Sequence, residues 1–464
     1  LKLKLCKAYG FEEVPPNSDI LANVEPEESR LLTPFLVKKP TRTISGVAVV
    51  AVMTSPHDCP HGRCSFCPGG VQNDSPQSYT GKEPAARRAG RNRFDPWMQV
   101  TDRVTQLTEI GHKTDKIDLI IMGGTFTSRE PDYQEWFVRR CFDALNGTDS
   151  ETLEDAQRLN ETSAHRCVGL TVETRPDVFT SEQIERVMGF GATRVELGVQ
   201  ILDDDVLAGV DRGHGTEEVR RCTRDCKDHG LKVCYHIMPG LPGSSPENDL
   251  RCFRKVFDDP AYRPDMLKFY PVLVVAGTKL YDMWQRGEYQ PYLEDTATEL
   301  LARMKQTVPE YVRIQRIQRD IPVTEISAGI HKSNIRQLVA DYMRDNGMRC
   351  RCIRCREVGH TGTVLSDPSK VVLKDTVYES CGGTEHFIAL EYEDSIIGYV
   401  RLRLDSNPEA TIRELKVFGK VASIGDEGED WQHRGFGREL VAEAERVSRD
   451  AGRTRIRVTS GVGV

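Results

Sequence analysis

The chain has 464 residues, of which 38% are hydrophobic and 29% charged, and its net charge is −7. This composition suits a soluble globular protein of two or three domains, and no stretch is apolar for long enough to cross a membrane. The negative net charge excludes attraction of nucleic acid by the molecule as a whole, so any such binding depends on local basic clusters. The 14 cysteines, several closely spaced, indicate metal ligation in a reducing cytoplasmic setting rather than a disulfide framework.

Residues 1–45 read as a polar, helical N-terminal segment with a proline break at Pro15-Pro16. Short apolar segments then alternate with stretches long enough for crossover helices, such as Ser181–Gly189 and Thr216–Gly230. This alternation predicts a parallel sheet with right-handed crossovers, and six units favour a partial (βα)6 TIM-like barrel over residues 46–295. The predicted strands are Val47–Met53, Asp118–Met122, Val168–Glu173, Val195–Val199, Val233–Ile237 and Leu267–Tyr270.

Glycines and polar side chains follow several of these strands. Because the carboxyl ends of parallel strands meet at one edge of the sheet, their recurrence there predicts a shared pocket. The residues concerned are Gly123, Gly124, Glu173, Arg175, Gln200 and the segment His236–Gly240.

Three cysteines, Cys59, Cys64 and Cys67, follow the first predicted strand with the spacing C-x4-C-x2-C. Three thiolates on a four-iron cluster leave one iron open, and an open iron can bind and reduce S-adenosylmethionine. The loop ends in Pro68-Gly-Gly70, which lets the backbone turn closely around a cluster. The alternative is a zinc site with His57 or His61 as fourth ligand; the motif favours the iron–sulfur cluster.

A second cysteine group, Cys350, Cys352 and Cys355, lies in the segment 296–370 that links the barrel to the rest of the chain. Three thiolates within six residues predict a bound ion, and zinc is the metal that prefers four such ligands in a closed structural site. Cys381, His360 and His386 are the candidates for the fourth ligand, and we favour Cys381. The position predicts a structural clamp at the domain junction.

After residue 371 the sequence reads as strands joined by turns, with a helix near 437–451. The segment Gln432-His-Arg-Gly435-Phe436-Gly437 opens this helix after a predicted strand, Ile412–Val417. Glycines at a helix start let backbone amides approach an anion, and the pattern matches the pyrophosphate cradle of acetyl-CoA-dependent N-acetyltransferase-like folds. The alternative is an ordinary turn before a surface helix.

Basic clusters supply the only electrostatic basis for binding nucleic acid. Each cluster alone is typical of a solvated surface, but together they could follow a phosphate backbone, and nearby aromatic rings could stack a splayed RNA base. The clusters are Lys38, Lys39 and Arg42; Arg87, Arg88, Arg91 and Arg93 with Phe94 and Trp97; and Arg349, Arg351, Arg354 and Arg356.

Taken together, these motifs resemble those of one family over essentially the whole chain: the catalytic subunit of Elongator and its stand-alone archaeal and bacterial homologues. The resemblance implies a radical S-adenosylmethionine barrel joined to a GNAT-like α+β domain at residues 371–464. The matching motifs are Cys59/Cys64/Cys67, Gly81-Lys-Glu-Pro84, Gly123-Gly-Thr-Phe126, Glu173-Thr-Arg175, Arg212-Gly-His214, Arg319-Asp-Ile-Pro322, Arg356-Glu-Val-Gly359 and Gln432-His-Arg-Gly-Phe-Gly437.

The resemblance implies an enzyme, a tRNA carboxymethyluridine synthase that uses a 4Fe–4S cluster, S-adenosylmethionine, acetyl-CoA and zinc. In the family mechanism a 5′-deoxyadenosyl radical takes hydrogen from the acetyl methyl group, and the resulting carbon radical adds to carbon 5 of the wobble uridine. Catalytic roles near the thioester fall to Lys116 and Glu414. Matched acetyl-CoA contacts are Lys116, Glu414, Leu415, Lys416, Val417, Gln432, Gly435, Phe436, Gly437, Arg438 and Glu439.

The resemblance implies tRNA as a partner, and a homodimer or Elongator-type subunits are the protein partners to consider. The family continues beyond Val464 with tyrosines near the thioester and carries a basic extension before Leu1, so we expect the acetyl-CoA domain to be C-terminally truncated here. Two other functions stay open: a protein lysine acetyltransferase with its base near Glu414, and a non-catalytic tRNA-binding scaffold.

Overall fold

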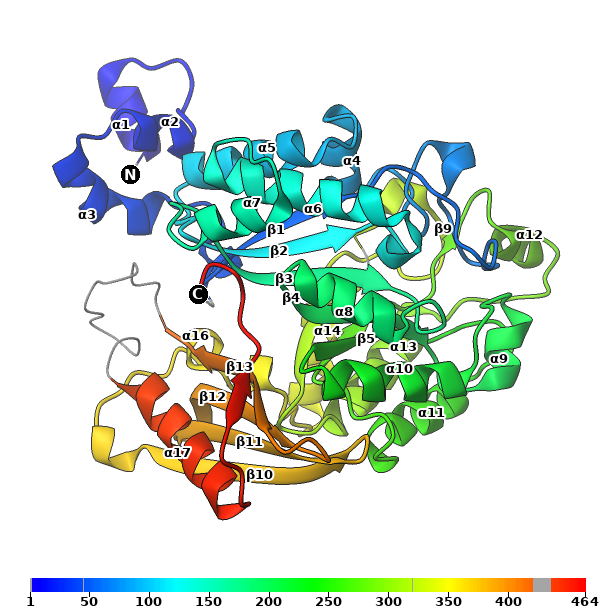
Figure 1. Cartoon of the computed structure of the whole chain (residues 1–464). Helices are drawn as coiled ribbons and strands as arrows, with labels where there is room; N and C mark the ends of the chain where they lie inside the picture. The colour runs from blue at the N-terminus through cyan, green and yellow to red at the C-terminus, as the bar shows by residue number, and fades with distance from the viewer. Residues whose placement is uncertain (1, 45, 319, 420–434) are drawn as a thin grey trace.

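The computed structural model describes residues 2–44, 46–318, 320–419 and 435–464. It consists of a small N-terminal helical group, a large α/β half-barrel and a C-terminal α+β domain below it (Figure 1). The N-terminal helices project from the body beside the first strand of the half-barrel (Figure 1). They are α1 (Lys2–Tyr9), α2 (Asn17–Ala22) and α3 (Pro26–Leu36). No described helix is both long and apolar enough to span a bilayer.

The half-barrel is a parallel sheet in which each strand pairs with the next one along the chain, as a right-handed βα succession requires. The sequence predicted six of its strands, and the structure adds a seventh. The strands are β1 (Ala48–Met53), β2 (Lys116–Met122), β3 (Arg166–Thr174), β4 (Ala192–Gln200), β5 (Lys232–Ile237), β6 (Met266–Phe269) and β8 (Arg313–Ile317).

The seventh strand was missed because Arg313 and Arg316 interrupt its apolar pattern. These arginines lie within the segment that the sequence analysis placed in the linker. The prediction of six strands is therefore wrong by one, although the partial barrel itself is confirmed.

Helices cover the outer face of the half-barrel (Figure 1). Several begin at a proline, which fixes φ for the first turn and loses no hydrogen bond there. The helices are α4 (Pro84–Arg91), α5 (Pro96–Glu109), α6 (Pro131–Asn146), α7 (Leu153–Asn160), α8 (Ser181–Gly189), α9 (Asp204–Gly209), α10 (Thr216–Asp228), α11 (Pro246–Asp258), α12 (Lys279–Gln285) and α13 (Glu294–Gln306). A two-stranded ribbon, β7 (Val274–Val275) and β9 (Ile326–Ala328), lies beyond the strands' carboxyl ends.

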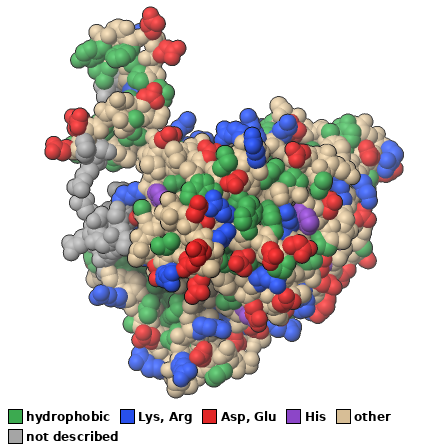
Figure 2. Space-filling view, turned by 45° about the horizontal axis from the view of Figure 1, so that its top comes forward, with side chains coloured by type: hydrophobic (Ala, Val, Ile, Leu, Met, Phe, Trp, Pro, Cys, Tyr) green, Lys and Arg blue, Asp and Glu red, His purple; other side chains and the backbone are tan. Residues whose placement is uncertain are grey.

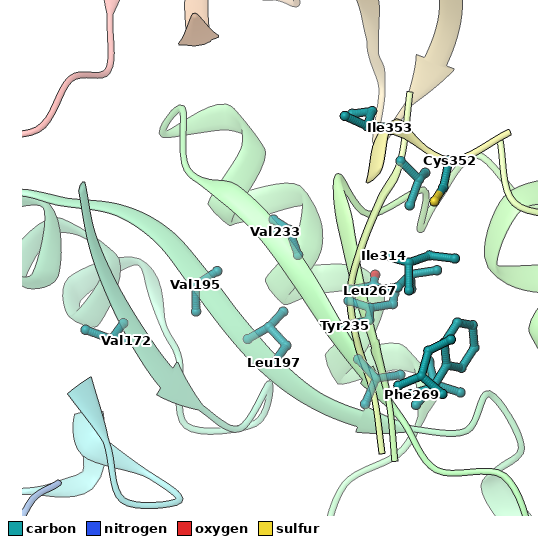
Figure 3. Packing of buried hydrophobic residues seen from close by; sticks show 14 of the residues in the cluster. Val172, Val195, Leu197, Val233, Tyr235, Leu267, Phe269, Ile314, Cys352 and Ile353 are labelled. Carbon is teal, nitrogen blue, oxygen red and sulfur yellow. The ribbon is translucent and has the colours of Figure 1, made fainter. Parts of the chain in front are cut away.

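The two faces of the sheet differ in chemistry because side chains alternate along each strand. Apolar residues occupy the outer face, where Val172, Val195, Val233, Leu267 and Ile314 form a continuous buried layer (Figure 3). The inner face carries many polar and charged residues beside apolar ones such as Ile120 and Met266; the polar residues are Asp118, Thr171, Glu173, Arg194, Glu196, Lys232, His236 and Lys268.

The segment between the two domains contains α14 (Ile335–Asp345), α15 (Ile353–Arg356) and α16 (Val358–Thr361). Cys352 and Ile353 lie above Ile314 of the half-barrel in the same buried cluster (Figure 3), and the Ile353 amide donates to the Val312 carbonyl at 2.9 Å. Glu357 bridges to Ile396 of the C-terminal domain. The segment therefore touches both domains.

The C-terminal domain is a five-stranded sheet with one long helix, α17 (Phe436–Asp450), packed on it. The sheet is antiparallel except for its last pair, β13 with β14. The strands are β10 (Val372–Ser380), β11 (Gly383–Tyr392), β12 (Ser395–Leu404), β13 (Ala410–Val417) and β14 (Ile456–Val458). These strands and α17 agree with the elements predicted after residue 371.

The C-terminal sheet docks on the amino ends of the half-barrel strands through buried ion pairs. Arg413 Nη2 lies 2.6 Å from Asp265 Oδ1 and 3.0 Å from Glu385 Oε2, and all three side chains are at most 1% exposed. Burial alone would raise the pKa of Asp265, but Arg413, Lys227 and Arg401 hold it far below its usual value. The interface therefore depends on paired charges that no water can reach.

We expect Arg413→Met to destabilise the protein by about 3–5 kcal/mol, because it leaves the Asp265 and Glu385 carboxylates buried without their cation. The free energy of unfolding from urea denaturation measures this loss. Arg446→Met is the matched control, since Arg446 lies on the surface of α17 and pairs there with Glu443 at 2.6 Å; it should cost no more than about 1 kcal/mol. Equal losses in the two variants would contradict a special role for the buried pairs.

Candidate functional site

A pocket opens at the carboxyl ends of the half-barrel strands, where the sequence predicted it. Its lining includes Met53 of β1, Met122 of β2, Glu196 of β4 and His236 of β5. The predicted residues Gly124, Glu173, Arg175 and Gln200 line the same pocket. Gly123 lies at its edge, where a β-carbon would come within 2.1 Å of Thr54 Oγ1, so only glycine fits there.

The Cys59–Cys67 loop lies at the mouth of this pocket, and each thiol has a polar neighbour. Cys59 Sγ lies 3.3 Å from Thr125 Oγ1, and the Ser78 amide donates to Cys67 Sγ at 3.3 Å. Arg212 Nη1 donates to Cys64 Sγ at 3.5 Å. Such donors stabilise thiolate ligands and tune the group that they hold.

The spacing of the thiols bears on the two metals considered for this loop. Among the described residues, the groups whose ligand atoms all lie within 4.8 Å of one another do not include Cys59, Cys64 and Cys67. A single zinc ion needs its ligands that close together, whereas a four-iron cluster separates them. The three thiols are therefore spaced more widely than around a single zinc ion, and a four-iron cluster accommodates a wider spacing.

A zinc site on the Cys59–Cys67 loop would also need a histidine ligand, and His61 already has other polar partners. Its Nε2 accepts a hydrogen bond from Arg175 Nη1 at 2.9 Å and lies 3.3 Å from Cys64 Sγ. Burial and the neighbouring guanidinium groups of Arg175 and Arg212 lower the pKa of His61 to about 4, so the ring is neutral at pH 7.

Three polar atoms at or behind the pocket wall are sealed from solvent without a partner among the described residues: Gln200 Oε1 of the lining, and Gln77 Oε1 and His61 Nδ1 of residues that contact the lining residues Gly124 and Arg175. Buried polar groups are nearly always satisfied, so these atoms point to a polar ligand or ordered water in the pocket. Glu173 Oε2 accepts from the Tyr79 hydroxyl at 2.7 Å and is held in place at the wall. The residues present therefore fit a polar cofactor beside an iron–sulfur cluster.

Sequence reasoning missed part of this site. Arg212 and His214 belong to a motif that supported the resemblance, yet neither was assigned to the pocket. Arg212 reaches Cys64 and also donates through Nη2 to the Gly198 carbonyl at 2.6 Å, so it ties the loop to β4. The sequence could not predict this contact, because Arg212 is 148 residues away from Cys64 along the chain.

The second predicted site lies at the other end of the barrel, on β13 and the start of α17. β13 pairs with β14 only at residues 410–412, so the stretch Glu414–Val417 has no partner on β14. Gly437, in the first turn of α17, faces Val417, with 3.8 Å between the Val417 Cγ2 atom and the position of a glycine β-carbon. A splayed strand beside a helix N-terminus suits an amide-containing chain that ends in a pyrophosphate.

The remaining predicted acetyl-CoA contacts are distributed around this opening. Gly435 caps α17 with a left-handed backbone, φ 87°, and Phe436, Arg438 and Glu439 follow it in the first turn. Leu415 is 45% exposed. Gln432 lies outside the described residues. Lys116 begins β2, two residues before Asp118 on the same face, and so lies at the barrel end to which β13 is docked.

Glu414, predicted as catalytic, is held as an anion by three cations. Burial would raise its pKa, but Lys232, Arg401 and Lys416 lower it to about 2. Arg401 Nε donates to Glu414 Oε2 at 3.0 Å. A carboxylate of this kind is a weak proton acceptor, so the arrangement does not favour a general base at Glu414.

The linker cysteines form one of the two compact ligand groups found among the described residues. The sulfur atoms of Cys350, Cys352 and Cys355 lie within 4.8 Å of one another, which suits one metal ion. Hydrogen bonds from Cys350 and Cys355 lower the pKa of Cys352 well below its usual value. This cluster lies between the two domains, as the sequence analysis expected of a clamp.

Cys381 is not part of this cluster, so its prediction as the fourth ligand is wrong. Its thiol lies 3.3 Å from the Ala261 carbonyl, and its amide donates to Pro260. The turn between β10 and β11 places Cys381 at the interface with the half-barrel, beside Ala261 and Tyr262, and not beside the linker cysteines. The other two candidates are also outside the cysteine group: His386 Nδ1 pairs with Asp375 at 2.7 Å, and His360 Nε2 lies 3.0 Å from Glu357 without a hydrogen bond between them.

Family profiles match almost the whole chain. The Radical SAM superfamily matches residues 53–253, the Radical_SAM C-terminal domain residues 264–345, and the Acetyltransferase (GNAT) family residues 363–462. The ELP3 N-terminal domain matches residues 1–44. The match to residues 264–345 includes β8, which accords with its place in the barrel sheet.

Three curated relatives are similar over nearly their full length. The tRNA uridine(34) acetyltransferase of Methanocaldococcus infernus is 50% identical over 97% of this chain and 88% of that protein. The protein of the same name from Dehalococcoides mccartyi is 47% identical over 92% of this chain and 95% of that protein. Elongator complex protein 3 of Homo sapiens is 41% identical over 100% of this chain and 89% of that protein.

One solved structure is similar in both fold and sequence. Archaeal Methanocaldococcus infernus Elp3 with an N-terminal deletion superposes with a TM-score of 0.81 and 46% sequence identity, covering 91% of this chain and 95% of that chain.

We expect Cys64→Ala to abolish the iron content of protein reconstituted anaerobically with iron and sulfide, which should otherwise reach about four iron ions per chain. Metal analysis and visible absorption spectroscopy measure the iron content. Cys222→Ala is the matched control, because Cys222 is a buried thiol on α10 outside both cysteine groups. Full iron in the Cys64→Ala protein would show that this loop does not hold the cluster.

Proposed function

The chain belongs to the family of tRNA uridine(34) acetyltransferases and Elongator complex protein 3, and from this we propose that it transfers an acetyl-derived carboxymethyl group from acetyl-CoA to carbon 5 of the wobble uridine of tRNA. The pairing of a Radical SAM match with a GNAT match in one chain is the observation that carries this proposal. A ring carbon has no useful nucleophilic electron pair here, so ordinary acyl transfer would not suffice.

The half-barrel pocket is the proposed site of the radical chemistry. Cys59, Cys64 and Cys67 would hold a 4Fe–4S cluster, and Glu173, Arg175 and Gln200 would border S-adenosylmethionine. When bound, these cofactors supply a carbon-centred radical. The protein's own contribution is to exclude water and to keep donors such as Arg212 and Ser78 directed at the cluster thiolates.

A basic groove supports tRNA as the substrate. It runs between α4, α5 and β1 and is lined by Arg42, Lys82, Arg87, Arg88, Arg91 and Arg103. The groove and the pocket share Ala85, Arg316 and Asp320 in their walls, so a strand followed along the groove arrives at the pocket. Figure 2 shows a group of Lys and Arg side chains at the upper edge of the molecule, where α4 and α5 lie in Figure 1.

The predicted basic cluster at Arg349, Arg351, Arg354 and Arg356 supports RNA binding less well. Arg356 is 3% exposed and pairs with Glu391 at 2.5 Å, and Arg351 pairs with Asp394 at 2.9 Å. These arginines hold the linker against the C-terminal domain. The groove beside α4 is therefore the favoured path for the phosphate backbone.

Acetyl-CoA would bind between β13, the start of α17 and Lys116, at the amino ends of the barrel strands. This position lies opposite the radical pocket, since a strand such as β5 carries Lys232 at one end and His236 near the other, about 13 Å apart. The acetyl group must cross this distance to react. The protein lysine acetyltransferase alternative gains no support, because the Glu414 carboxylate is fixed by cations.

Cys350, Cys352 and Cys355 would hold zinc as a structural clamp. Zinc takes four ligands in closed structural sites. None of the three candidates named from the sequence completes the site among the described residues, so the fourth ligand stays open.

Nucleoside mass spectrometry of tRNA tests the proposed function. We expect the natural full-length protein, reconstituted anaerobically and given reductant, S-adenosylmethionine and isotope-labelled acetyl-CoA, to produce labelled carboxymethyl-uridine. Cys64→Ala should produce none. Absence of the labelled nucleoside despite an intact cluster and bound tRNA would refute the proposal and direct attention to labelled protein lysines.

Charge reversal in the groove tests the tRNA path. We expect Arg87→Glu to weaken tRNA binding uniformly across sequences and to reduce the slope of log K against log salt by about one to two charges, because Arg87 is exposed beside the groove. Filter binding at several salt concentrations measures both quantities. Arg449→Glu on α17 reverses a charge far from the groove and should leave the slope unchanged; equal effects of the two variants would contradict the assignment.

A further inference from the structure

Three polar side chains form a linked group at the floor of the radical pocket. His236 Nε2 donates to Glu196 Oε2 at 2.8 Å, and Lys268 Nζ donates to the same oxygen atom. His236 and Glu196 both line the pocket. Glu196 is fully buried and Lys268 is 8% exposed, so the group is closed from below. Neither the proposed cluster ligands nor the proposed cofactor contacts include these residues.

The neighbours of Glu196 determine its charge. Burial would raise the pKa of this carboxyl, but Lys268, His236 and Arg194 hold it far below its ordinary value. Arg194 Nε lies 3.9 Å from Glu196 Oε1 on the other side. Glu196 is therefore a fixed anion beneath the imidazole.

A fixed anion at Nε2 selects the tautomer of His236. The proton must lie on Nε2, where Glu196 accepts it, and this leaves a lone pair on Nδ1. No described residue hydrogen-bonds Nδ1, and this atom is not among the sealed, unpartnered polar atoms, so it faces the pocket. The Tyr270 ring meets the imidazole edge-on, with centroids 5.1 Å apart, and limits its rotation.

A metal site is the competing explanation for this group. The ligand atoms of Glu196, Cys234 and His236 lie within 4.8 Å of one another. However, the Lys268 ammonium group already occupies the Glu196 oxygen that would face an ion, and burial raises the pKa of Cys234 well above its usual value. A cationic amine and a protonated thiol disfavour a dication, whereas they suit a carboxylate that orients a histidine.

We propose that His236 Nδ1 is the base that removes the proton from carbon 5 of the uracil ring, with Glu196 and Lys268 as positioning residues. This inference rests on the proposed function. Addition of the acetyl-derived carbon radical forms the new C–C bond at carbon 5 and leaves an unpaired electron at carbon 6. Restoring the C5=C6 bond breaks the C5–H bond: its proton passes to Nδ1, and one electron must pass to a one-electron oxidant, a role that an oxidised iron–sulfur cluster bound in this pocket would supply.

The position of the group suits this role. The basic groove leads to the part of the pocket wall that contains Arg316, and Arg316 is the register partner of Lys268, which in turn pairs with His236. The His236 imidazole at the floor of the pocket would therefore face a uracil ring that enters through the pocket opening. The orienting carboxylate also stabilises the imidazolium that forms on proton transfer, as in other carboxylate–histidine pairs.

The first test measures the tautomer without any cofactor. In protein labelled with ¹⁵N-histidine, the His236 signals, identified by their loss in His236→Gln, should show a proton on Nε2 and none on Nδ1. Glu196→Gln should shift this equilibrium. A proton on Nδ1 in the unmodified protein would overturn the proposal, because Nδ1 would then have no lone pair to accept another.

The second test uses tRNA whose target uridine carries deuterium at carbon 5. We expect His236→Gln to lower the rate of carboxymethyl-uridine formation about 100-fold while S-adenosylmethionine cleavage to 5′-deoxyadenosine stays within about twofold, since a base typically contributes 10²–10⁴-fold. The hydrogen-to-deuterium rate ratio should rise above that of the unmodified protein, because proton removal becomes slower than the preceding steps. His386→Gln is the matched control: His386 forms a similar pair with Asp375 at 2.7 Å, outside the pocket.

The outcomes separate the two proposals. Unmodified protein that forms no carboxymethyl-uridine refutes the proposed function and this inference with it. If the unmodified protein is active, an unchanged rate and isotope ratio in His236→Gln refutes the inference alone. Equal losses of nucleoside and 5′-deoxyadenosine would also refute it, since they would assign His236 to the fold or to cofactor binding.

Discussion

The pairing of charges inside the half-barrel is the interaction on which the rest of the structure depends. A barrel interior is ordinarily filled by branched apolar side chains. Here the apolar side chains pack outward against the helices, and the inner face carries the chain of contacts His236–Glu196–Arg194–Asp118 (Figure 3 shows the apolar face). Arg194 Nη2 lies 3.1 Å from Asp118 Oδ2, which extends the chain toward the amino ends of the strands. Such an interior is stable only if each charge keeps its partner, because an unpaired buried charge costs several kcal/mol.

This arrangement places polar groups along much of the inner face, beside apolar residues such as Ile120 and Met266. Thr171 Oγ1, Arg194 Nε and Glu196 Oε1 are sealed without a protein partner among the described residues, and such atoms ordinarily bind ordered water. The pocket at one end of the half-barrel and β13 at the other thus share an interior that contains paired charges. The C-terminal domain closes the amino end through Asp265, Arg401 and Arg413, whose buried pairs resist separation of the domains.

The elements that the sequence predicted well are those whose signal is local. Six barrel strands, the helix Ser181–Gly189 and the strands and helix of the C-terminal domain follow from apolar runs and turn residues that are close along the chain. The sequence did not predict strand β8, because its arginines belong to the charged inner face and to the domain interface. Its residue pattern is therefore not that of a buried strand. Cys381 was assigned to the wrong cluster because three nearby cysteines suggested a fourth, while the fold of β10 and β11 carries it to Ala261.

By itself, the sequence determined the family, the two-domain plan and the identity of the ligand types, since these reside in short motifs such as Cys59–Cys67 and Gly435–Gly437. Only the tertiary structure decided which residues act together. Arg212 meets Cys64 from 148 residues away. Glu196, His236 and Lys268 come from three successive strands, and their link depends on the register of β4, β5 and β6. The charge of Glu414 likewise depends on Lys232 and Arg401, from two different strands. Charge states and contacts of this kind depend on distances in space, which the order of residues along the chain does not contain.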